Sequence, residues 1–311
     1  MKWNEIDIIA SSSMIDDIEL LLIKSEVSGW QVVDIDDNPE LMIVRFYISD
    51  NNTDKLIIEA VETGIEELNS KKSKKNYVPI TISQTLVDDE NWLDVWKEYF
   101  KPIEIGQDIV IKPVWAKYNI PEKIIMEIEP GNVFGTGQHE TTRLCIEALE
   151  RYIKPGDVIM DIGCGSGILS IISLMLGADY CVAVDFNTDV PEAVYQNARL
   201  NRISIDKLDM RVGDVFNSPH LLMPVIPSYK HVIHGFDCIV ANIVADAIIN
   251  LTPLIIDMEC LKPDGLFIAS GIMNDSVDSV ISTLKTADFN VINVDVLGDW
   301  SCVVGVPQQT R

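Results

Sequence analysis

The sequence predicts an α/β protein with a doubly wound, mostly parallel seven-stranded sheet, preceded by a small α+β domain of the ferredoxin-like type. Three observations carry this prediction. Beyond residue 120 strands and helices alternate, as in parallel sheets that are covered by helices on both faces. Residues 1–88 follow the order strand, helix, strand, strand, helix, strand, which fits a ferredoxin-like sandwich. A glycine-rich turn follows one strand of the alternating part and marks a ligand-binding edge.

The first domain is expected to span residues 1–88. Its elements follow from the apolar periodicity, and the almost continuously apolar run Leu41–Ile48 indicates a strand. We expect its strands and helices at 2–10, 13–27, 30–36, 41–49, 53–70 and 78–87. The basic run Lys71–Lys75 follows the second helix, where a solvated loop is the simplest interpretation.

Residues 89–120 are expected to contain a linker helix and connecting strands. Four apolar side chains recur at helical spacing in this segment, Trp92, Val95, Trp96 and Tyr99. We interpret these aromatic residues as packing between domains rather than as ligand contacts. The Lys101-Pro102 pair ends the helix.

The second domain is expected to span residues 121–311. Its predicted strands are 124–129, 157–162, 180–185, 208–212, 236–241, 264–270, 289–297 and 300–306. Its predicted helices are 140–153, 167–177, 191–202, 244–260 and 273–287, and residues 215–235 are expected to be irregular. The last two strands are separated only by Gly298-Asp299, which predicts an antiparallel hairpin at the edge of the sheet.

Composition limits the classes of function. The 311 residues carry 48 acidic and 24 basic side chains, for a formal net charge of −24. This charge argues against binding to nucleic acid phosphates, and it either favours a basic partner or serves solubility alone. The six cysteines form no C-x-x-C pair, which indicates reduced core residues without a metal site. With neither a signal peptide nor an apolar run of 18 residues, we expect a cytoplasmic protein that binds no membrane.

The glycine-rich turn is the segment Asp161–Gly167, which follows the apolar run Val158–Met160. Its three glycines bring bare backbone close to a ligand at the carboxyl edge of a parallel sheet. A dinucleotide fingerprint needs glycine or alanine three residues after Gly165, where this chain has Ile168, and no Gly-Lys-Ser/Thr of a phosphate loop follows. The turn therefore predicts a nucleotide-type site of another kind.

Polar residues follow the next three strands. Asp185 ends a strand 22 residues after Gly163, where doubly wound folds place a carboxylate on ribose hydroxyls. Asp214 follows the next strand and is either an adenine contact or a simple turn residue. Asn242 follows the strand after that, and its amide can accept hydrogen bonds from an amine.

A second unusual segment is Glu129–Thr142, in which three glycines surround Phe134 and Thr136 before polar residues that cap a helix. Such a loop can fold over a bound ligand. The alternative is a plain surface loop.

Together the run Gly131–Thr142, the Asp161–Gly167 turn, Asp185 and Asn242 resemble the PrmA family, bacterial methyltransferases that act on large-subunit ribosomal protein eleven. The resemblance extends through the Trp92–Phe100 segment. The family pattern Phe-Gly-Thr-Gly-x-His-Pro-Thr-Thr is the most specific part of it. The resemblance implies the class I methyltransferase fold, which is Rossmann-like.

The resemblance also implies the ligand and the roles of the domains. The cofactor is expected to be S-adenosylmethionine, with family contacts at Thr142, Gly163, Asp185 and Asn242. The wider set predicted to bind the cofactor adds Phe134, Gly135, Thr136, Gly165 and Asp214. The first domain is expected to capture the basic ribosomal protein, whose lysine side chains and amino-terminal amine are methylated.

The chain departs from the family pattern at a few positions. Glu140 stands where proline is usual, Asn187-Thr188 replaces an Asp-Pro pair, Val244 replaces leucine, and the stretch Phe216–Gly235 is long. The first two changes bear on the geometry of the loop and of the turn beside the ribose.

Methyl transfer to an amine requires positioning more than covalent help from the protein. We expect Asn242 to orient the amine, and His139 either accepts its proton or shapes the loop. His231 and His234 show H-x-x-H spacing but lack further ligands, so no metal site is predicted. The alternative functions are a class I methyltransferase with another protein or small-molecule target, and a catalytically silent module that binds the cofactor.

Overall fold

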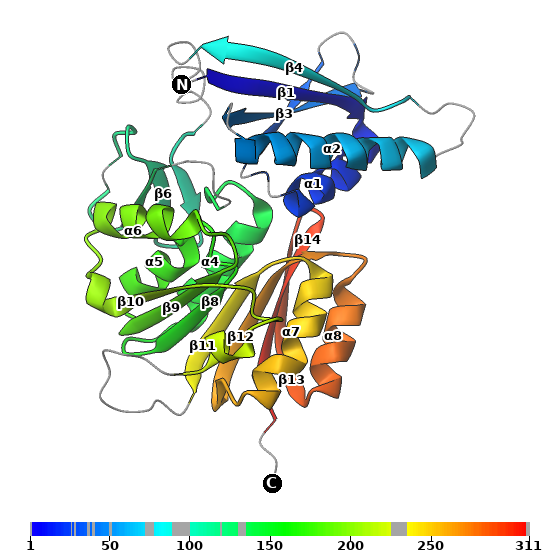
Figure 1. Ribbon diagram of the computed structural model, residues 1–311. Coiled ribbons are helices and arrows are strands. Elements are labelled where there is room, and N and C mark those ends of the chain that lie inside the picture. The colour runs from blue at the N-terminus through cyan, green and yellow to red at the C-terminus, as the bar shows by residue number, and fades with distance from the viewer. Residues whose placement is uncertain are drawn as a thin grey trace. The chain divides into compact units, whose positions relative to one another are not determined.

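A computed structural model of the chain describes residues 2–25, 27, 29–35, 38, 41–49, 52–71, 78–88, 100–118, 120–129, 135–224 and 235–308. The chain divides into two compact units (Figure 1). The first lies within Met1–Lys101, and the second combines Pro102–Glu129 with Gly135–Arg311. The linker helix predicted around Trp92 and Trp96 lies outside the described residues, so it stays a prediction.

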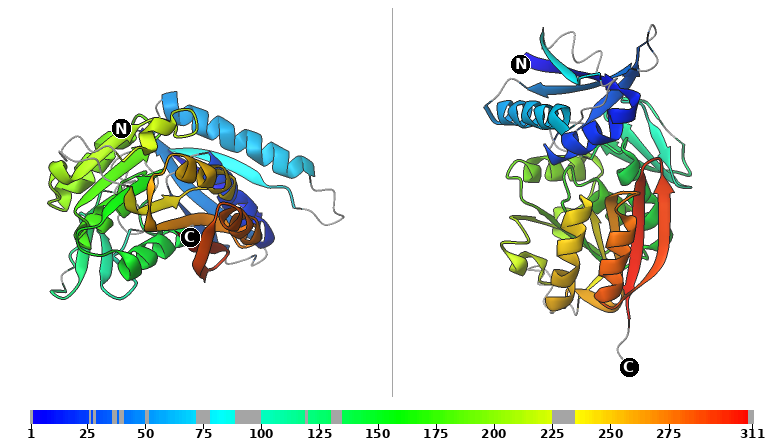
Figure 2. Two further views of the ribbon diagram at one scale, coloured as in Figure 1. Left: turned by 90° about the horizontal axis from the view of Figure 1, so that it is seen from below. Right: turned by 90° about the vertical axis from the view of Figure 1, so that its right-hand side faces the viewer.

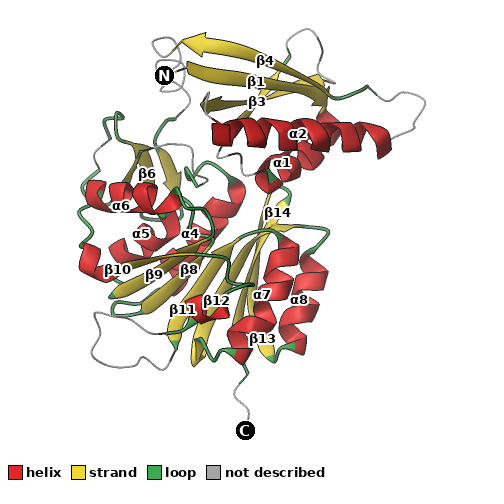
Figure 3. Cartoon of the chain, in the orientation of Figure 1, coloured by secondary structure: helices red, strands yellow, loops and turns green. Residues whose placement is uncertain are grey.

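In its described residues, the first unit is a four-stranded antiparallel sheet with two helices on one face (Figures 1 and 3). Its strands are β1 (Lys2–Ser11), β2 (Trp30–Asp34), β3 (Leu41–Ser49) and β4 (Thr81–Asp88), in the spatial order β2-β3-β1-β4. Its helices are α1 (Ile15–Lys24) and α2 (Asn52–Lys71), and a 3-10 helix over Ser12–Met14 precedes α1. This order and topology confirm the ferredoxin-like prediction.

Alternation along the strands separates a dry face from a polar one. Ile6 and Ile8 of β1 are fully buried and pack with Phe46 of β3 and with Ile18 and Val61 of the two helices. The residues between them point to the opposite face because successive strand side chains alternate. The helices therefore cover only the apolar side of the sheet.

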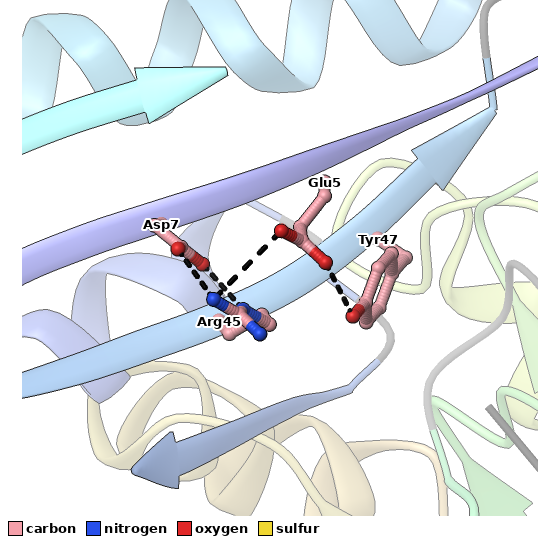
Figure 4. A network of polar contacts seen from close by, with 4 residues as sticks. All are labelled: Glu5, Asp7, Arg45 and Tyr47. Carbon is pink, nitrogen blue, oxygen red and sulfur yellow. Dashed lines mark hydrogen bonds and ion pairs between the residues drawn. The ribbon is translucent and has the colours of Figure 1, made fainter. Parts of the chain in front are cut away.

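On the other face, a polar network joins β1 to β3 (Figure 4). The Arg45 guanidinium donates to both carboxylate oxygens of Asp7, at 2.6 Å each. It also lies 3.7 Å from Glu5, which accepts a hydrogen bond of 2.7 Å from the Tyr47 hydroxyl. The hydrogen bond with Asp7 raises the pKa of Arg45, and burial opposes that rise. Since Asp7 lies opposite Arg45 and Glu5 opposite Tyr47, these contacts fix the register of the two strands.

Within the described residues, the main sheet of the second unit has seven strands. They are β8 (Val158–Ile162), β9 (Tyr180–Asp185), β10 (Leu208–Val212), β11 (Phe236–Asn242), β12 (Leu261–Met273), β13 (Phe289–Leu297) and β14 (Trp300–Pro307). The spatial order is β10-β9-β8-β11-β12-β14-β13, and only the pairs that involve β14 are antiparallel. The predicted doubly wound, mostly parallel sheet is confirmed.

Helices cover both faces of this sheet (Figure 2). They are α4 (Glu140–Tyr152), α5 (Ile168–Met175), α6 (Val190–Leu200), α7 (Ala245–Asp257) and α8 (Val277–Thr286), with short 3-10 helices at Ile205–Lys207 and Pro219–Leu222. Helices α7 and α8 pack together on one side, and α4, α5 and α6 lie on the other. Strand β8 is buried along its whole length, which explains why its sequence is almost continuously apolar.

The carboxyl-terminal hairpin forms at the predicted Gly298-Asp299 turn, with Leu297 opposite Trp300. Strand β12 is longer than the predicted 264–270, because it continues to Met273 to pair with Trp300. Helix α8 consequently begins at Val277 rather than at 273.

A separate three-stranded sheet belongs to the second unit. It consists of β5 (Ile103–Ile105), β6 (Ile109–Pro113) and β7 (Ile124–Ile128), in the order β5-β6-β7. Strands β5 and β6 are antiparallel, whereas β6 and β7 are parallel. This sheet combines β5 and β6, from the predicted linker, with β7, from the predicted second domain. The division into domains at residues 88 and 120 stays a prediction.

The six cysteines are all buried and form no disulfide. Burial raises the thiol pKa of several of them, including Cys164 and Cys238, so these thiols are poor nucleophiles. No helix in the described part of the chain has the length and apolarity needed to cross a membrane.

The polar network of the first unit can be tested with Arg45→Met. The substitution leaves the part-buried carboxylates of Asp7 and Glu5, 19% and 23% exposed, without their cation. We expect the free energy of unfolding to fall by about 1–3 kcal/mol. Urea denaturation followed by circular dichroism measures this change. The double variant Asp7→Asn/Arg45→Met serves as the control, because it should lose less than the sum of the single variants. Full additivity would contradict the coupling.

Candidate functional site

The candidate residues gather at the carboxyl ends of neighbouring parallel strands. Gly163 follows β8, Asp185 ends β9, Asp214 follows β10 and Asn242 ends β11. These strands lie side by side in the order β10-β9-β8-β11. The sheet thus brings four separate stretches of sequence to one edge, where open α/β sheets bind their ligands.

The glycine turn between β8 and α5 has a backbone that only glycine adopts easily. Gly163, Gly165 and Gly167 have φ angles of +73°, +50° and +77°. The amides of Gly163 and Cys164 both donate to the carbonyl oxygen of Val184, at 2.8 and 3.1 Å. A Cβ atom on Gly163 would lie 2.6 Å from the side chain of Ile243. Ile243 thus packs against Gly163 and leaves no room for a side chain at this position.

Asp185 holds the middle of this turn. Its Oδ2 accepts a hydrogen bond of 2.9 Å from the Gly165 amide, and its Oδ1 accepts one of 3.0 Å from the Asn187 amide. Each carboxylate oxygen can accept a further hydrogen bond, which leaves capacity for ribose hydroxyls. Asn187, one of the departures from the family pattern, accepts from the Asp189 amide at 2.9 Å and so forms the turn that leads into α6.

Asp161 holds the turn from below, where β8 meets α5. Its Oδ2 accepts hydrogen bonds from the Ser170 amide at 3.0 Å and from the Ser170 hydroxyl at 2.6 Å. The side chain is fully buried, and its Oδ1 has no hydrogen-bond partner. Burial raises the pKa of the Asp161 carboxyl to about 7, Ser170 limits the rise, and the charge of Asp185 adds to it. A carboxyl with a pKa near neutral pH thus links β8 to α5, on the two sides of the glycine turn.

Asn242 and Thr142 meet although 100 residues separate them in the sequence. Asn242 Nδ2 lies 3.4 Å from the Thr142 hydroxyl, at the long end for a hydrogen bond. Thr142 is fully buried in the first turn of α4, next to Thr141, whose carbonyl accepts a hydrogen bond of 3.1 Å from Ser270. An amide that donates through Nδ2 keeps its oxygen as an acceptor for an amine.

His139 is the N-cap of α4. Its Nδ1 accepts from the Thr141 amide at 3.2 Å and lies 2.8 Å from the Thr141 hydroxyl. The ring packs edge-on against Trp300, with centroids 5.1 Å apart. Burial lowers the pKa of His139, and the charge of Glu140 partly opposes this. Glu140 is the first residue of α4, a position that suits both the acidic side chain found here and the proline usual in the family.

The described part of the second unusual segment begins at Gly135, and Phe134 lies outside the described residues. Gly135 has a φ of +102°, and its carbonyl oxygen accepts a hydrogen bond of 2.5 Å from the Ser166 hydroxyl. A Cβ atom on Gly137 would lie 3.2–3.3 Å from Ile111 and Ile168. The segment therefore packs closely on the glycine turn and on the start of α5.

Asp214 is next to Asp185 but is engaged in its own turn. The Gly213 amide donates to the Asp185 carbonyl oxygen at 2.8 Å, which brings the two strand ends together. The Asp214 carboxylate accepts from the Phe216 amide at 2.9 Å and from the Asn217 side chain. These contacts make Asp214 a turn residue, and any ligand contact comes in addition.

The sequence alone did not single out three further residues at this edge. Phe186 follows Asp185 directly and is 60% exposed, so it offers a flat apolar face beside the carboxylate. Ser166 joins the glycine turn to Gly135, and Asn197 of α6 joins it to Glu129. The only signal for Asn197 is that asparagine is a poor helix former in the middle of a helix.

Comparison with known proteins adds to this geometry. A family model described as "Ribosomal protein L11 methyltransferase (PrmA)" matches residues 2–308. A relative named ribosomal protein L11 methyltransferase from Clostridium perfringens is 34% identical over 279 residues, which are 88% of this chain and 83% of the relative. Another with the same name, from Caldicellulosiruptor saccharolyticus, is 36% identical over 305 residues, covering 96% and 91%. The crystal structure of a ribosomal protein L11 methylase from Lactobacillus delbrueckii subsp. bulgaricus is 28% identical, with a TM-score of 0.57, and covers 68% of this chain and 100% of its own.

The raised pKa of Asp161 predicts a pH-dependent stability. The unfolded carboxyl titrates near pH 4, so the folded state alone keeps the proton between about pH 4 and pH 7. The contribution of Asp161 is fully present below pH 4 and is lost as the pH rises to 7, at about 1.4 kcal/mol per pKa unit. Asp161→Asn still accepts from Ser170 but does not ionise. Urea denaturation should therefore show the variant gaining a few kcal/mol relative to wild type between pH 4.5 and pH 8, whereas an equal difference at both pH values would contradict the assignment.

The lowered pKa of His139 predicts the opposite dependence of stability on pH. Its lowered pKa means that its contribution is present above about pH 6.5 and is lost as the pH falls through the folded value. His139→Asn keeps an acceptor for the Thr141 amide and removes the titration, so its stability should fall less than that of wild type below pH 6.5. His139→Ala, the comparison variant, should lose about 1 kcal/mol at pH 8. Thermal unfolding at pH 5 and pH 8 measures both. A wild-type pH response in His139→Asn would show that His139 does not cause the pH dependence, and an unchanged stability of His139→Ala at pH 8 would contradict the cap.

Proposed function

The chain belongs to the ribosomal protein L11 methyltransferase (PrmA) family, and from this premise we propose that it transfers methyl groups from S-adenosylmethionine to ribosomal protein L11. The acceptors are lysine side chains and the amino-terminal amine of the substrate. The observation that carries the proposal is the joint geometry of two pairs at one sheet edge. Asp185 accepts a hydrogen bond from Gly165 of the glycine turn. Asn242, at the end of β11, lies against Thr142.

The site suits the proposed methyl donor. The glycine turn suits the amino-acid end of the molecule, because Gly163 and Gly165 are partly exposed and carry no side chain that would block the approach to their backbone. Asp185 can accept hydrogen bonds from the ribose. Phe186 is the next residue in the sequence, and its exposed ring offers an apolar surface for the adenine. We assign Thr142, Gly135, Thr136 and Asp214 to the same site, and Phe134 remains a sequence-based member of it.

The chemistry asks little covalent work of the protein. S-adenosylmethionine supplies an electrophilic methyl group on a sulfonium, and the acceptor amine must be neutral to attack it. A free lysine has a pKa of about 10.4, and desolvation beside a positive charge lowers it. Asn242 orients the amine through its amide oxygen. His139 is engaged with Thr141 as a helix cap, which supports a role in shaping the loop rather than as a base.

The first unit is proposed to capture the ribosomal protein. The chain carries 48 acidic and 24 basic side chains, a balance that suits a basic partner. The polar face of the first unit presents two carboxylates, Glu5 and Asp7, to one guanidinium, Arg45, so the network keeps a net negative charge. Capture by a separate unit would leave the second unit to bind the cofactor.

The proposal is tested by incubating the full chain with labelled S-adenosylmethionine and purified ribosomal proteins. We expect label on protein L11, located by mass spectrometry on lysine and amino-terminal amines. Label on another protein would show that the substrate is not L11. Binding of S-adenosylmethionine without transfer of label would indicate a catalytically silent module.

Asp185→Ala tests the ribose contact in the same assay. Loss of a hydrogen-bonding carboxylate should weaken S-adenosylmethionine binding by about tenfold or more. Asp189→Ala is the matched control, because Asp189 is exposed, lies four residues away, and its side chain makes no cap hydrogen bond. Equal affinities for the two variants would refute the assignment, and isothermal titration calorimetry measures both.

A further inference from the structure

Strand β7 lies at the edge of the three-stranded sheet, and its outer backbone groups are met by Asn197 of α6 and by Asn201, the C-cap residue of that helix. Asn201 makes two hydrogen bonds to Glu127: its Oδ1 accepts from the amide at 2.8 Å, and its Nδ2 donates to the carbonyl oxygen at 2.6 Å. Asn197 Oδ1 accepts from the Glu129 amide at 3.0 Å. The two asparagines thus take the place of a neighbouring strand.

The spacing of the two elements makes this pairing possible. Four residues along a helix advance about 6 Å. Two residues along a strand advance about 6.6 Å. Asn197 and Asn201 therefore match Glu129 and Glu127 in steps of nearly equal length, with helix and strand running in opposite directions.

The two asparagines differ in their second partner. Nδ2 of Asn201 donates to the carbonyl oxygens of Glu127 and Asn197. Asn197 instead donates through Nδ2 to the carbonyl oxygen of Ser166, at 2.9 Å. Ser166 belongs to the glycine turn, so Asn197 connects β7 to the proposed cofactor site.

Ser166 completes the connection on its other side. Its hydroxyl donates to the carbonyl oxygen of Gly135 at 2.5 Å. Asn197 and Ser166 are buried, with exposed fractions of 1% and 4%. Three hydrogen bonds thus link Glu129, Asn197, Ser166 and Gly135 in series, and we call this connection the Asn197–Ser166 relay.

The packing around the relay leaves little room for other arrangements. A Cβ atom on Gly135 would lie 2.8 Å from the Ser166 hydroxyl oxygen, and one on Gly167 would lie 3.1 Å from Val194 of α6. The glycine turn is therefore seated on α6 at Gly167 and tied to it at Ser166.

We propose that Asn197 and Ser166 are positioning residues of the methyl-transfer site, which hold Glu129 and Gly135 against the glycine turn and thereby set the affinity for S-adenosylmethionine. The inference rests on the proposed function. A ligand that binds to backbone already held in place pays less for ordering it, so loss of the relay weakens binding although neither side chain is assigned a ligand contact. Asn201 makes comparable hydrogen bonds but reaches no part of the glycine turn.

The test compares two substitutions with two matched controls in the full chain. Asn197→Ala and Ser166→Ala each break the relay. Asn201→Ala removes the asparagine at the C-cap of α6, and Ser173→Ala removes a buried hydroxyl that bonds only within α5, to Leu169 at 2.8 Å. Calorimetry gives the dissociation constant for S-adenosylhomocysteine, thermal unfolding gives the stability, and steady-state assays separate KM from kcat.

We expect Asn197→Ala and Ser166→Ala to weaken S-adenosylhomocysteine binding about fivefold or more, the factor that one hydrogen bond contributes, and to raise KM for the methyl donor. The controls should lose similar stability with less than about twofold change in binding. The double variant Asn197→Ala/Ser166→Ala should lose less affinity than the two single losses combined, because both act on one relay.

Other results would overturn the inference. If affinity follows the loss of thermal stability equally in all four variants, the two residues are merely structural. If the double variant is fully additive, no relay joins them. A wild-type chain that binds no S-adenosylhomocysteine would overturn the proposed function together with this inference, whereas wild-type binding with unaffected relay variants would overturn the inference alone.

Discussion

The glycine turn between β8 and α5 lacks bulky side chains of its own to hold its shape, and the site depends on the groups that hold it from outside. Asp185 fixes Gly165, Asp161 closes the turn onto Ser170, and the Val184 carbonyl receives two of its amides. Each holder comes from a strand buried on both faces. Hydrogen bonds to buried strands therefore fix the shape of the turn, even though glycine is the most flexible residue in an unfolded chain.

The parts of the molecule that could be predicted from sequence are those with a local pattern of apolar residues. Strand β8 is buried throughout and β9 up to its last residue, so their apolar runs, and the residues that end them, were visible as local patterns. The Gly298-Asp299 hairpin was visible for the same reason. The far end of β12 was not, because Met273 is drawn into the strand by Trp300, which lies 27 residues further on. The family pattern supplied Thr142, whose burial beside Asn242 has no local sequence signal.

The contacts between the site and its surroundings escaped prediction for a physical reason. Asn197, Ser166 and Gly135 lie in three separate segments, and an asparagine in a helix carries no periodic signal. Likewise, the environment of Asp161 depends on burial, and its raised pKa arises from the absence of water rather than from neighbouring sequence. Local patterns thus predicted the frame and the residues at the strand ends, while long-range polar pairing had to come from the folded chain.

Asn197 of α6 and Asn201 at its C-cap also bear on how the protein behaves in a crowded solution. An uncovered edge strand offers its backbone to any extended chain and is a common start of aggregation. Asn201 and Asn197 occupy the amides of Glu127 and Glu129, so an incoming strand would have to displace them first. Asn197, proposed above as a positioning residue of the site, would thus also hinder the pairing of β7 with another chain, so a substitution there bears on aggregation as well as on cofactor binding.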